Sequence, residues 1–498
     1  MHVSFHEYRT RQGNKFEQQA WASKQSMKAY SSGSTDRDLL LGADASIAFH
    51  DQDKEWSHAI NGNVMVFGGT GAGKTMGFVG PNLAQGLDCN YIVADPKGEL
   101  TAIFADYYRS KGYRVSVLDS IELSKSDGYD PLRYITCEED ILSVSKLLLE
   151  ALSENRRKTL DGFWNETSEM LVRAGIGILW ELENINGIFS PLEQCDEGRK
   201  RTDPVYLRLN RLADLFSLLR TQNASSVSKS PLDRLVEMLE SDQYRCYGGS
   251  SGKTGYGVRQ YQSVKCSAQE TFLSIIISMQ VCMMKLDNVE TRALLDHDEL
   301  HLDQIDEEKR IVFIKMSDND SSKSFLSKMC IKQLFNAAQR KADSQGGRLK
   351  RNLMFVLDEF PNIGKIDDFE RSIATVRSRG INFLMAAQSL AQIEGVYGPE
   401  GARTVLDNCD TILYMGSGSS LETARYIASL CGEAELGTRY VGVEKTKVIA
   451  TESIISPGQV SLLPRSSCIV KISGCRPFKT TKLHLLDHPN AGMLNLKH

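Results

Sequence analysis

The sequence predicts an α/β domain with a mainly parallel, twisted sheet that is interrupted by an all-helical insertion. Short apolar runs, each followed by a polar or glycine-containing turn, alternate with helical patterns along the first part of the chain. Between about Glu138 and Glu308 long helical periodicities replace this pattern, and the strand pattern resumes afterwards. We therefore expect the two flanks of the insertion to build one sheet.

The strand candidates are short apolar runs bounded by turn residues. Before the insertion they are Val64–Phe67, Tyr91–Ala94 and Val115–Leu118. After it they are Ile311–Ile314, Leu353–Leu357, Ile381–Met385, Ile412–Tyr414 and Ile469–Ile472. Runs that are apolar throughout are typical of strands buried on both faces of a sheet.

Size and composition are those of a folded protein with more than one structural unit. The chain has 498 residues, of which 41% are hydrophobic and 24% are charged. Its net charge of -4 provides no broad basic surface, so contacts with nucleic acid must come from local patches or a lined channel. The 11 cysteines form no C-x-x-C pair, which is typical of a reduced, cytoplasmic protein without structural zinc. Because no window reaches the ~18 apolar residues of a membrane helix, we expect this chain to be soluble.

A phosphate-binding motif follows the first strand candidate directly. Its residues are Gly68, Gly69, Thr70, Gly71, Ala72, Gly73, Lys74 and Thr75, which fit G-x-x-x-x-G-K-[ST]. Glycines let the backbone wrap around phosphates with its N–H groups inward, and the following helix start adds partial positive charge. We expect ATP and Mg²⁺ here, with Lys74 on the β- and γ-phosphates and the Thr75 hydroxyl on the metal. The alternative is a glycine-rich turn without a ligand.

Two acidic residues follow the apolar run Leu353–Leu357. Asp358 would lie at the carboxyl end of this strand, where open parallel sheets bind ligands, and is the second candidate metal ligand. Glu359 is the candidate general base that takes a proton from the attacking water. Two solvated acids at a strand end are the alternative interpretation.

Further candidates surround the run that begins at Ile381. Gln388 closes it and is a candidate sensor of the γ-phosphate or the attacking water, or else a surface glutamine. Arg379 precedes it and is the preferred candidate for an arginine finger that reaches a neighbouring subunit's ATP, with Arg377 as second choice. Most arginines are instead solvated or packed along their stems.

Four segments follow from the periodicities and these motifs. They are a polar arm over 1–38, the first part of a nucleotide-binding domain over 39–138, an all-α inserted domain over 139–308, and the second part of the nucleotide-binding domain over 309–498.

At this point the chain resembles a known family, the type IV secretion coupling proteins, which are conjugative DNA-transfer ATPases related to FtsK-type translocases. The resemblance rests on the Gly68–Thr75 motif and three further stretches. These stretches are Ala94–Leu100 (ADPKGEL), Leu357–Ile366 (LDEFPNIGKI), and Arg379–Gly380 together with Ala387–Ile393 (AQSLAQI). Asp95 and Lys97, at the end of the second strand candidate, are therefore candidate contacts to phosphate, metal or the next subunit. A structural turn built around Pro96 and Gly98 is the alternative.

The resemblance implies a RecA-like domain with an inserted all-α domain, and six subunits around a central channel. It also implies partners: relaxase-bound single-stranded DNA, protein effectors, and the inner-membrane components of a type IV secretion system at the cytoplasmic face of the membrane. Such proteins usually carry N-terminal membrane helices, whereas about 60 mostly polar residues precede the Gly68–Thr75 motif here. Either that segment was removed, or this is a soluble member that docks through a partner.

Two rival functions share the ATPase core. One is an FtsK-like double-stranded DNA translocase or packaging motor, which should lack the Ala94–Leu100 stretch and the helical insertion. The other is a substrate receptor whose slow ATPase switches its shape. Two basic clusters, Arg156–Lys158 and Arg199–Arg201, are candidate contacts to DNA or acidic tails, or solvated helix ends.

Overall fold

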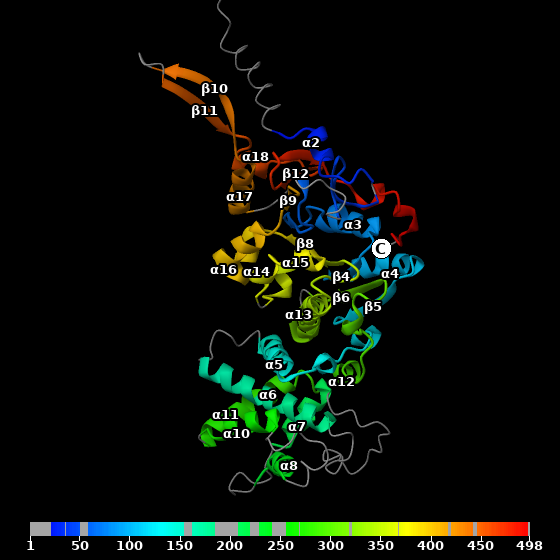
Figure 1. Cartoon of the computed structure of the whole chain (residues 1–498), viewed down its shortest axis with the longest axis vertical. Helices are drawn as coiled ribbons and strands as arrows, with labels where there is room; N and C mark the ends of the chain where they lie inside the picture. The colour runs from blue at the N-terminus through cyan, green and yellow to red at the C-terminus, as the bar shows by residue number, and fades with distance from the viewer. Residues whose placement is uncertain are drawn as a thin grey trace, which may run out of the picture. The chain divides into compact units, whose positions relative to one another are not determined.

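The computed structural model describes most of the chain (Figure 1). The described residues are 21–34, 36–49, 58–153, 162–184, 208–219, 229–241, 255–267, 269–317, 321–366, 368–416, 420–441 and 446–496. They form two compact units, which we call unit 1 (within 1–115, 304–314 and 338–498) and unit 2 (within 116–303 and 315–337). The two basic clusters at 156–158 and 199–201 lie outside the described residues.

A nine-stranded sheet, most of which belongs to unit 1, has the strand order β13-β12-β9-β3-β8-β7-β4-β6-β5 among the described residues. Its strands are β3 (Val64–Phe67), β4 (Asn90–Asp95), β5 (Arg114–Asp119), β6 (Arg310–Lys315), β7 (Leu353–Leu357), β8 (Ile381–Ala387), β9 (Thr411–Tyr414), β12 (Ser467–Ile472) and β13 (Phe478–Thr481). The pairs β9/β3, β3/β8, β8/β7 and β7/β4 are parallel, and β12 is antiparallel to both β9 and β13. The mainly parallel sheet and all eight predicted strands are confirmed.

The central strands are apolar throughout because both of their faces are buried. Every residue of β3, β7 and β8 is buried, as expected for parallel strands covered by helices on two sides. The helices of unit 1 that follow β3 are α3 (Gly80–Gln85), α4 (Glu99–Ser110), α14 (Phe369–Ser372), α15 (Val376–Arg379), α16 (Leu390–Asp407), α17 (Leu421–Cys431) and α18 (Pro457–Ser461). Helix α13 (Ser321–Ser344) belongs to unit 2 up to Ala337 and to unit 1 from Ala338 on.

The structure also contains two antiparallel hairpins that the sequence patterns did not predict. They are β1 (Asp38–Gly42) with β2 (Ala45–Ala48), and β10 (Glu433–Val441) with β11 (Thr446–Ser453). The apolar run of β1 is only three residues long (Leu39–Leu41), and β10 and β11 mix charged, polar and apolar residues, so the strand pattern was weak there. The described end of the polar arm contains a short helix, α2 (Lys24–Lys28), with Met27 and Tyr30 buried. This part of the arm therefore belongs to the folded unit.

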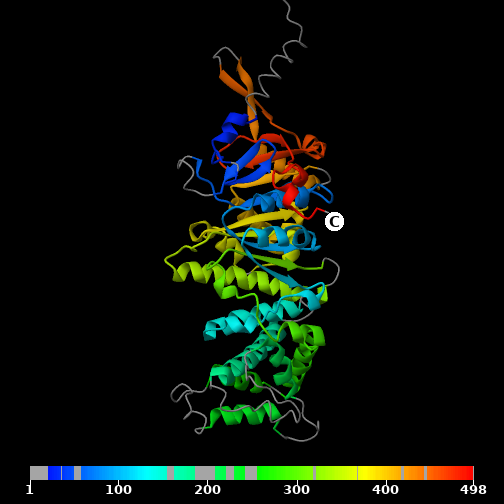
Figure 2. The ribbon, with the colours of Figure 1, turned by 90° about the vertical axis from the view of Figure 1, so that its right-hand side faces the viewer.

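Unit 2 is mainly helical in its described part, drawn cyan to green in Figure 2, and also contains most of β5. Its helices are α5 (Glu138–Ser153), α6 (Gly162–Asn184), α7 (Leu209–Ser217), α8 (Pro231–Glu240), α10 (Tyr256–Lys265), α11 (Gln269–Met283) and α12 (Val289–Leu294). Helices α6 and α10 approach closely because Gly177 faces Gly257, where an added Cβ would lie 2.2 Å from a backbone nitrogen. The expected helical insertion is confirmed. Among the helices described in either unit, none is both long and apolar enough to cross a membrane.

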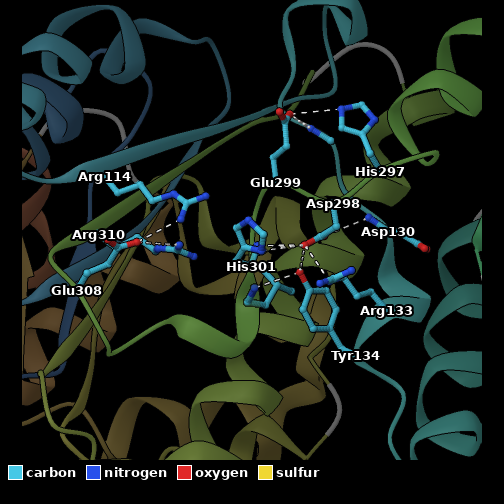
Figure 3. Close-up of polar contacts among 12 residues, drawn as sticks. Arg114, Asp130, Arg133, Tyr134, His297, Asp298, Glu299, His301, Glu308 and Arg310 are labelled. Carbon is cyan, nitrogen blue, oxygen red and sulfur yellow. Dashed lines mark hydrogen bonds and ion pairs between the residues drawn. The ribbon is translucent and has the colours of Figure 1, made fainter. Parts of the chain in front are cut away.

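Within unit 2, the segments that enter and leave the helices meet at Asp298 (Figure 3). The Tyr134 hydroxyl donates to Oδ2 of this buried carboxylate at 2.6 Å, and the His301 N–H donates to the same oxygen at 3.1 Å. The Asp130 N–H donates to Oδ1 at 3.3 Å. The Tyr134 oxygen also accepts the Leu302 N–H at 3.1 Å, so one hydroxyl satisfies a charge and an amide.

We predict that Tyr134→Phe lowers the stability of unit 2 by about 1 to 3 kcal/mol, because a buried charge loses a donor and Leu302 loses its acceptor. Thermal unfolding together with protease cleavage within residues 116–303 measures this. The control is Tyr107→Phe, whose hydroxyl donates to a neutral carbonyl, that of Ala84, at 2.8 Å. An equal or larger loss in the control would contradict the special role of the Asp298 charge.

Candidate nucleotide-binding site

The candidate residues gather at one edge of the sheet because four neighbouring strands end there. The Gly68–Thr75 loop, called the P-loop below, follows β3, and Gln388 follows β8. Asp358 and Glu359 follow β7, and Asp95 is the last residue of β4. Since β3, β8, β7 and β4 are adjacent and parallel, their carboxyl ends meet at a single edge.

The P-loop needs its glycines. Gly71 and Gly73 have φ angles of 72° and 83°, in the left-handed region that side chains disfavour. A Cβ at Gly68 would lie 2.9 Å from the Cβ of Ala72, so this position requires glycine for space. The loop continues into a π-helical turn at Thr75–Val79 and then into α3. Departures of this kind from α-helical geometry are frequent at functional sites.

Lys74 is buried within the loop, with a relative exposure of 6%. Its Nζ donates to the Gly68 carbonyl at 2.9 Å and lies 3.2 Å from Oε1 of Glu359. The ammonium is therefore held between the loop and the acid that follows β7.

Thr75 and Asp358 meet directly beneath the loop. The Thr75 hydroxyl donates to Oδ2 of Asp358 at 2.6 Å, while Oδ1 is buried without a hydrogen-bond partner among the described residues. Burial raises the pKa of Asp358 to about 6; the Thr75 hydrogen bond opposes this rise and the charge of Glu359 adds to it. A buried carboxylate oxygen without a donor is costly, and a hard divalent cation would satisfy it. These two side chains therefore fit Mg²⁺.

Two residues alone do not complete a magnesium site. In the described part of the chain, no three His, Cys, Asp or Glu side chains gather as metal ligands. Mg²⁺ is usually bound by one or two protein groups together with substrate phosphates and water. The arrangement at Thr75 and Asp358 thus suits a cation that arrives with a nucleotide.

Glu359 adopts an unusual backbone conformation, with φ 61° and ψ 53°. Such left-handed geometry in a residue with a side chain costs about 1 to 2 kcal/mol and is enriched at functional sites. Gln388 Nε2 donates to Oε2 of Glu359 at 3.3 Å, and Thr70 Oγ1 donates to Oε1 of Gln388 at 3.4 Å. The Glu359 carboxylate is therefore oriented from both sides, by an amide and by the Lys74 ammonium.

The turn after β8 has a further support that sequence reasoning missed. The Gln388 N–H donates to Oε1 of Gln392 at 2.9 Å. Gln392 lies in the AQSLAQI stretch and in the first turn of α16, whereas Gln388 precedes this helix by two positions.

Asp95 and Lys97 lie near the site in different ways. Oδ2 of Asp95 accepts both the N–H and the hydroxyl of Thr101 at 2.7 Å, which ties β4 to the first turn of α4. Burial raises the pKa of Asp95, and its charge also raises the pKa of Asp358. Lys97 is exposed. The geometry of Asp95 is thus that of a turn-forming residue close to Asp358, the candidate metal ligand.

Arg379 lies away from the P-loop of its own chain. It ends the short helix α15, which also contains Arg377, and precedes β8 by two positions. Its Nε and Nη2 contact Oδ1 and Oδ2 of Asp343 at 2.8 and 3.2 Å. Seven residues of β8 separate this end of the strand from the Gln388 end, a distance of about 20 Å.

We predict that Asp358→Asn makes the nucleotide-free protein more stable at pH 7.5. The raised pKa means that the folded state binds the Asp358 proton more tightly than the unfolded state, so wild-type stability falls as the pH rises from about 4 through 6. The difference amounts to about 3 kcal/mol at most, and asparagine avoids it. Melting temperatures measured in EDTA at pH 7.5 and 5 test this. A variant advantage that did not shrink at pH 5 would contradict the prediction.

Known conjugative transfer proteins are similar to this chain over most of its length. The VirD4 protein of Rhizobium rhizogenes is 24% identical over 443 residues, which cover 84% of this chain and 58% of the relative. Coupling protein TraD of Escherichia coli strain K12 is 26% identical over 403 residues, covering 78% and 51%. The chain therefore spans between half and three fifths of the length of these relatives.

Solved structures share the fold. The unbound form of the conjugative coupling protein TrwBdeltaN70 superposes with a TM-score of 0.62 at 14% identity, covering 96% of this chain and 93% of that one. TrwB in complex with ADP and Mg²⁺ gives a TM-score of 0.59 at 14% identity, covering 95% and 92%. The expected RecA-like P-loop fold with a helical insertion is thereby confirmed. The family model for type IV secretory system conjugative DNA transfer matches residues 14–491, and this chain belongs to that family.

Proposed function

We propose that this chain is an ATP-hydrolysing coupling protein that recruits relaxase-bound single-stranded DNA, or a protein effector, and drives its transfer into a type IV secretion channel. One observation carries the enzymatic part. Lys74, Thr75, Asp358 and Glu359 come from two distant stretches of sequence and meet at one edge of the sheet. Membership of the conjugative DNA-transfer family supports the transport part.

The residues divide the chemistry between them. The P-loop N–H groups and Lys74 would bind the phosphates, and Thr75 with Asp358 would hold Mg²⁺, which supplies charge neutralisation on the phosphoryl oxygens. The contact between Lys74 and Glu359 would couple binding to catalysis, because the γ-phosphate would compete with Glu359 for the Lys74 ammonium. Once Lys74 turns to phosphate, Glu359 is released to take the proton of a water that Gln388 helps to orient.

The proposed setting is a homohexamer at the cytoplasmic face of the membrane, in contact with the inner-membrane components of the secretion system. Family membership supports this setting. TrwB, which shares the fold, has been solved with ADP and Mg²⁺ and with GTP and ATP analogues, which supports a nucleotide at the P-loop.

We predict that Lys74→Ala weakens ATP binding and lowers turnover by about 10²- to 10³-fold, because phosphate charge is left uncompensated. Glu359→Gln should keep ATP binding and lower turnover by about 10²- to 10⁴-fold, because an amide cannot take a proton. Nucleotide affinity and phosphate release, each measured with and without single-stranded DNA, test the proposal. Stimulation of the wild type by a protein substrate but not by DNA would instead favour a switch-like receptor. Unchanged turnover in both variants would refute the site.

Arg379 is the candidate residue for a contact between subunits. Because Arg379 lies at the opposite edge of the sheet from Lys74, we propose that it serves the ATP of a neighbouring chain. Arg379→Ala chains and Lys74→Ala chains, each nearly inactive alone, should regain activity when mixed, since some interfaces then pair an intact Arg379 with an intact Lys74. Fingers of this kind contribute about 10³- to 10⁵-fold in other P-loop enzymes. Co-assembly without recovery would count against Arg379, and Arg377→Ala in the same mixture is the matched comparison.

A further inference from the structure

A lysine far from every motif contacts the P-loop. Lys482 follows β13, and its Nζ donates to the Ala72 carbonyl at 2.7 Å. Its own backbone N–H donates to the Ser466 carbonyl at 2.8 Å, so the base of the side chain is fixed. The side chain is partly buried, and this burial lowers the pKa of Lys482. A cation in this position is costly unless a strong acceptor compensates for lost water.

The contact fixes the orientation of one peptide group in the loop. The Ala72 carbonyl and the Gly73 N–H belong to the same trans peptide, so they point in opposite directions. Holding the carbonyl toward Lys482 turns the Gly73 N–H away from Lys482. Gly73 has a φ of 83° and no Cβ, so the backbone itself restricts this peptide only weakly.

Lys482 is held by more than its own strand. The residues that follow it, Lys482–Asn490, run beside the turn and helix that continue the P-loop, and we call them the C-terminal strap. Leu485 is fully buried, with its Cδ2 3.1 Å from where a Cβ of Gly80 would lie. His488 Nε2 lies 3.0 Å from Oε1 of Gln85, and Asn490 Nδ2 donates to the Ala84 carbonyl at 2.8 Å. The strap therefore anchors Lys482 against both ends of α3.

We infer that Lys482 is a positioning residue, which presets the Gly73 N–H as a phosphate donor before nucleotide arrives. This inference rests on the proposed binding of nucleotide at the P-loop. A preset donor adds affinity because the peptide need not be ordered when the ligand binds. A lysine that only stabilised the fold would leave nucleotide affinity unchanged.

The test compares Lys482→Met, which keeps the stem but removes the donor, with Lys482→Arg, which restores a cationic donor. The control is Lys479→Met, an equal charge change at an exposed position of β13. Two quantities are measured: the Kd of a fluorescent ATP analogue with Mg²⁺, and amide hydrogen exchange over residues 71–75 in the nucleotide-free protein. Lys482→Met should raise the Kd about tenfold or more and speed exchange in the P-loop. Lys482→Arg should recover most of the affinity, and Lys479→Met should match the wild type.

The outcomes separate this inference from the proposed function. If the wild type binds the analogue and Lys482→Met binds it within twofold, the positioning role is refuted while the proposed function stands. If the wild type does not bind the analogue at all, the proposed function fails. Should Lys482→Met melt far below the wild type, Lys482→Gln replaces it, since a shorter amide donor keeps polarity but reaches the Ala72 carbonyl poorly. A full recovery of affinity in Lys482→Gln would also contradict the inference.

Discussion

The parallel pairing of β3, β8, β7 and β4 is the constraint on which the site depends. Phe67 pairs with Ala387, Leu357 with Met385, and Ala94 with Leu357, so four strand ends are fixed relative to one another. A slip of one residue would turn each side chain of these strands to the opposite face of the sheet. Because both faces are apolar, the pattern alone would tolerate such a slip, and the close packing of side chains of different size prevents it. The strand ends that lead into the P-loop, Asp358 and Gln388 are therefore placed by core packing, and the glycines of the P-loop then place Lys74.

The residues at the strand ends carry a cost in folding free energy. Among the described residues no donor reaches Oδ1 of Asp358, the pKa of this carboxyl is raised, and Glu359 occupies a strained backbone conformation. Both features raise the free energy of the nucleotide-free state. A ligand that brings a divalent cation would offset the cost of the buried Asp358 oxygen. If the same ligand drew Lys74 away from Glu359, the strained backbone would present a free carboxylate for catalysis. Folding stability and nucleotide binding would thus be linked through Asp358, Glu359 and Lys74.

Sequence patterns were sufficient for the elements that are buried on both faces and for residues next to them. All eight predicted strands are present, and Asp358 lies beside Thr75 although 283 positions separate them. The patterns failed for β10 and β11, where charged and polar residues are mixed with apolar ones along the strand. They also failed for contacts that carry no local signature: Lys482 reaches Ala72 across 410 positions, and nothing in the surrounding residues distinguishes it from a solvated lysine. The left-handed backbone of Glu359 was equally unpredictable, because only residues such as Gly, Asn and Asp adopt this geometry often enough for the sequence to indicate it.

The ion pair between Arg379 and Asp343 would have to break before Arg379 could act on the ATP of a neighbouring subunit, as proposed above. Both side chains are partly exposed, at 23% and 54%, so breaking their two contacts costs about 1 kcal/mol. A finger that raises the rate 10³- to 10⁵-fold stabilises the transition state by about 4 to 7 kcal/mol. The gain exceeds the loss by several kcal/mol, so the pair would hold Arg379 in a defined place without preventing its use. If Arg379 is the proposed finger, Asp343 would hold its guanidinium in the single chain, and assembly would replace that carboxylate with the phosphate of a neighbouring subunit.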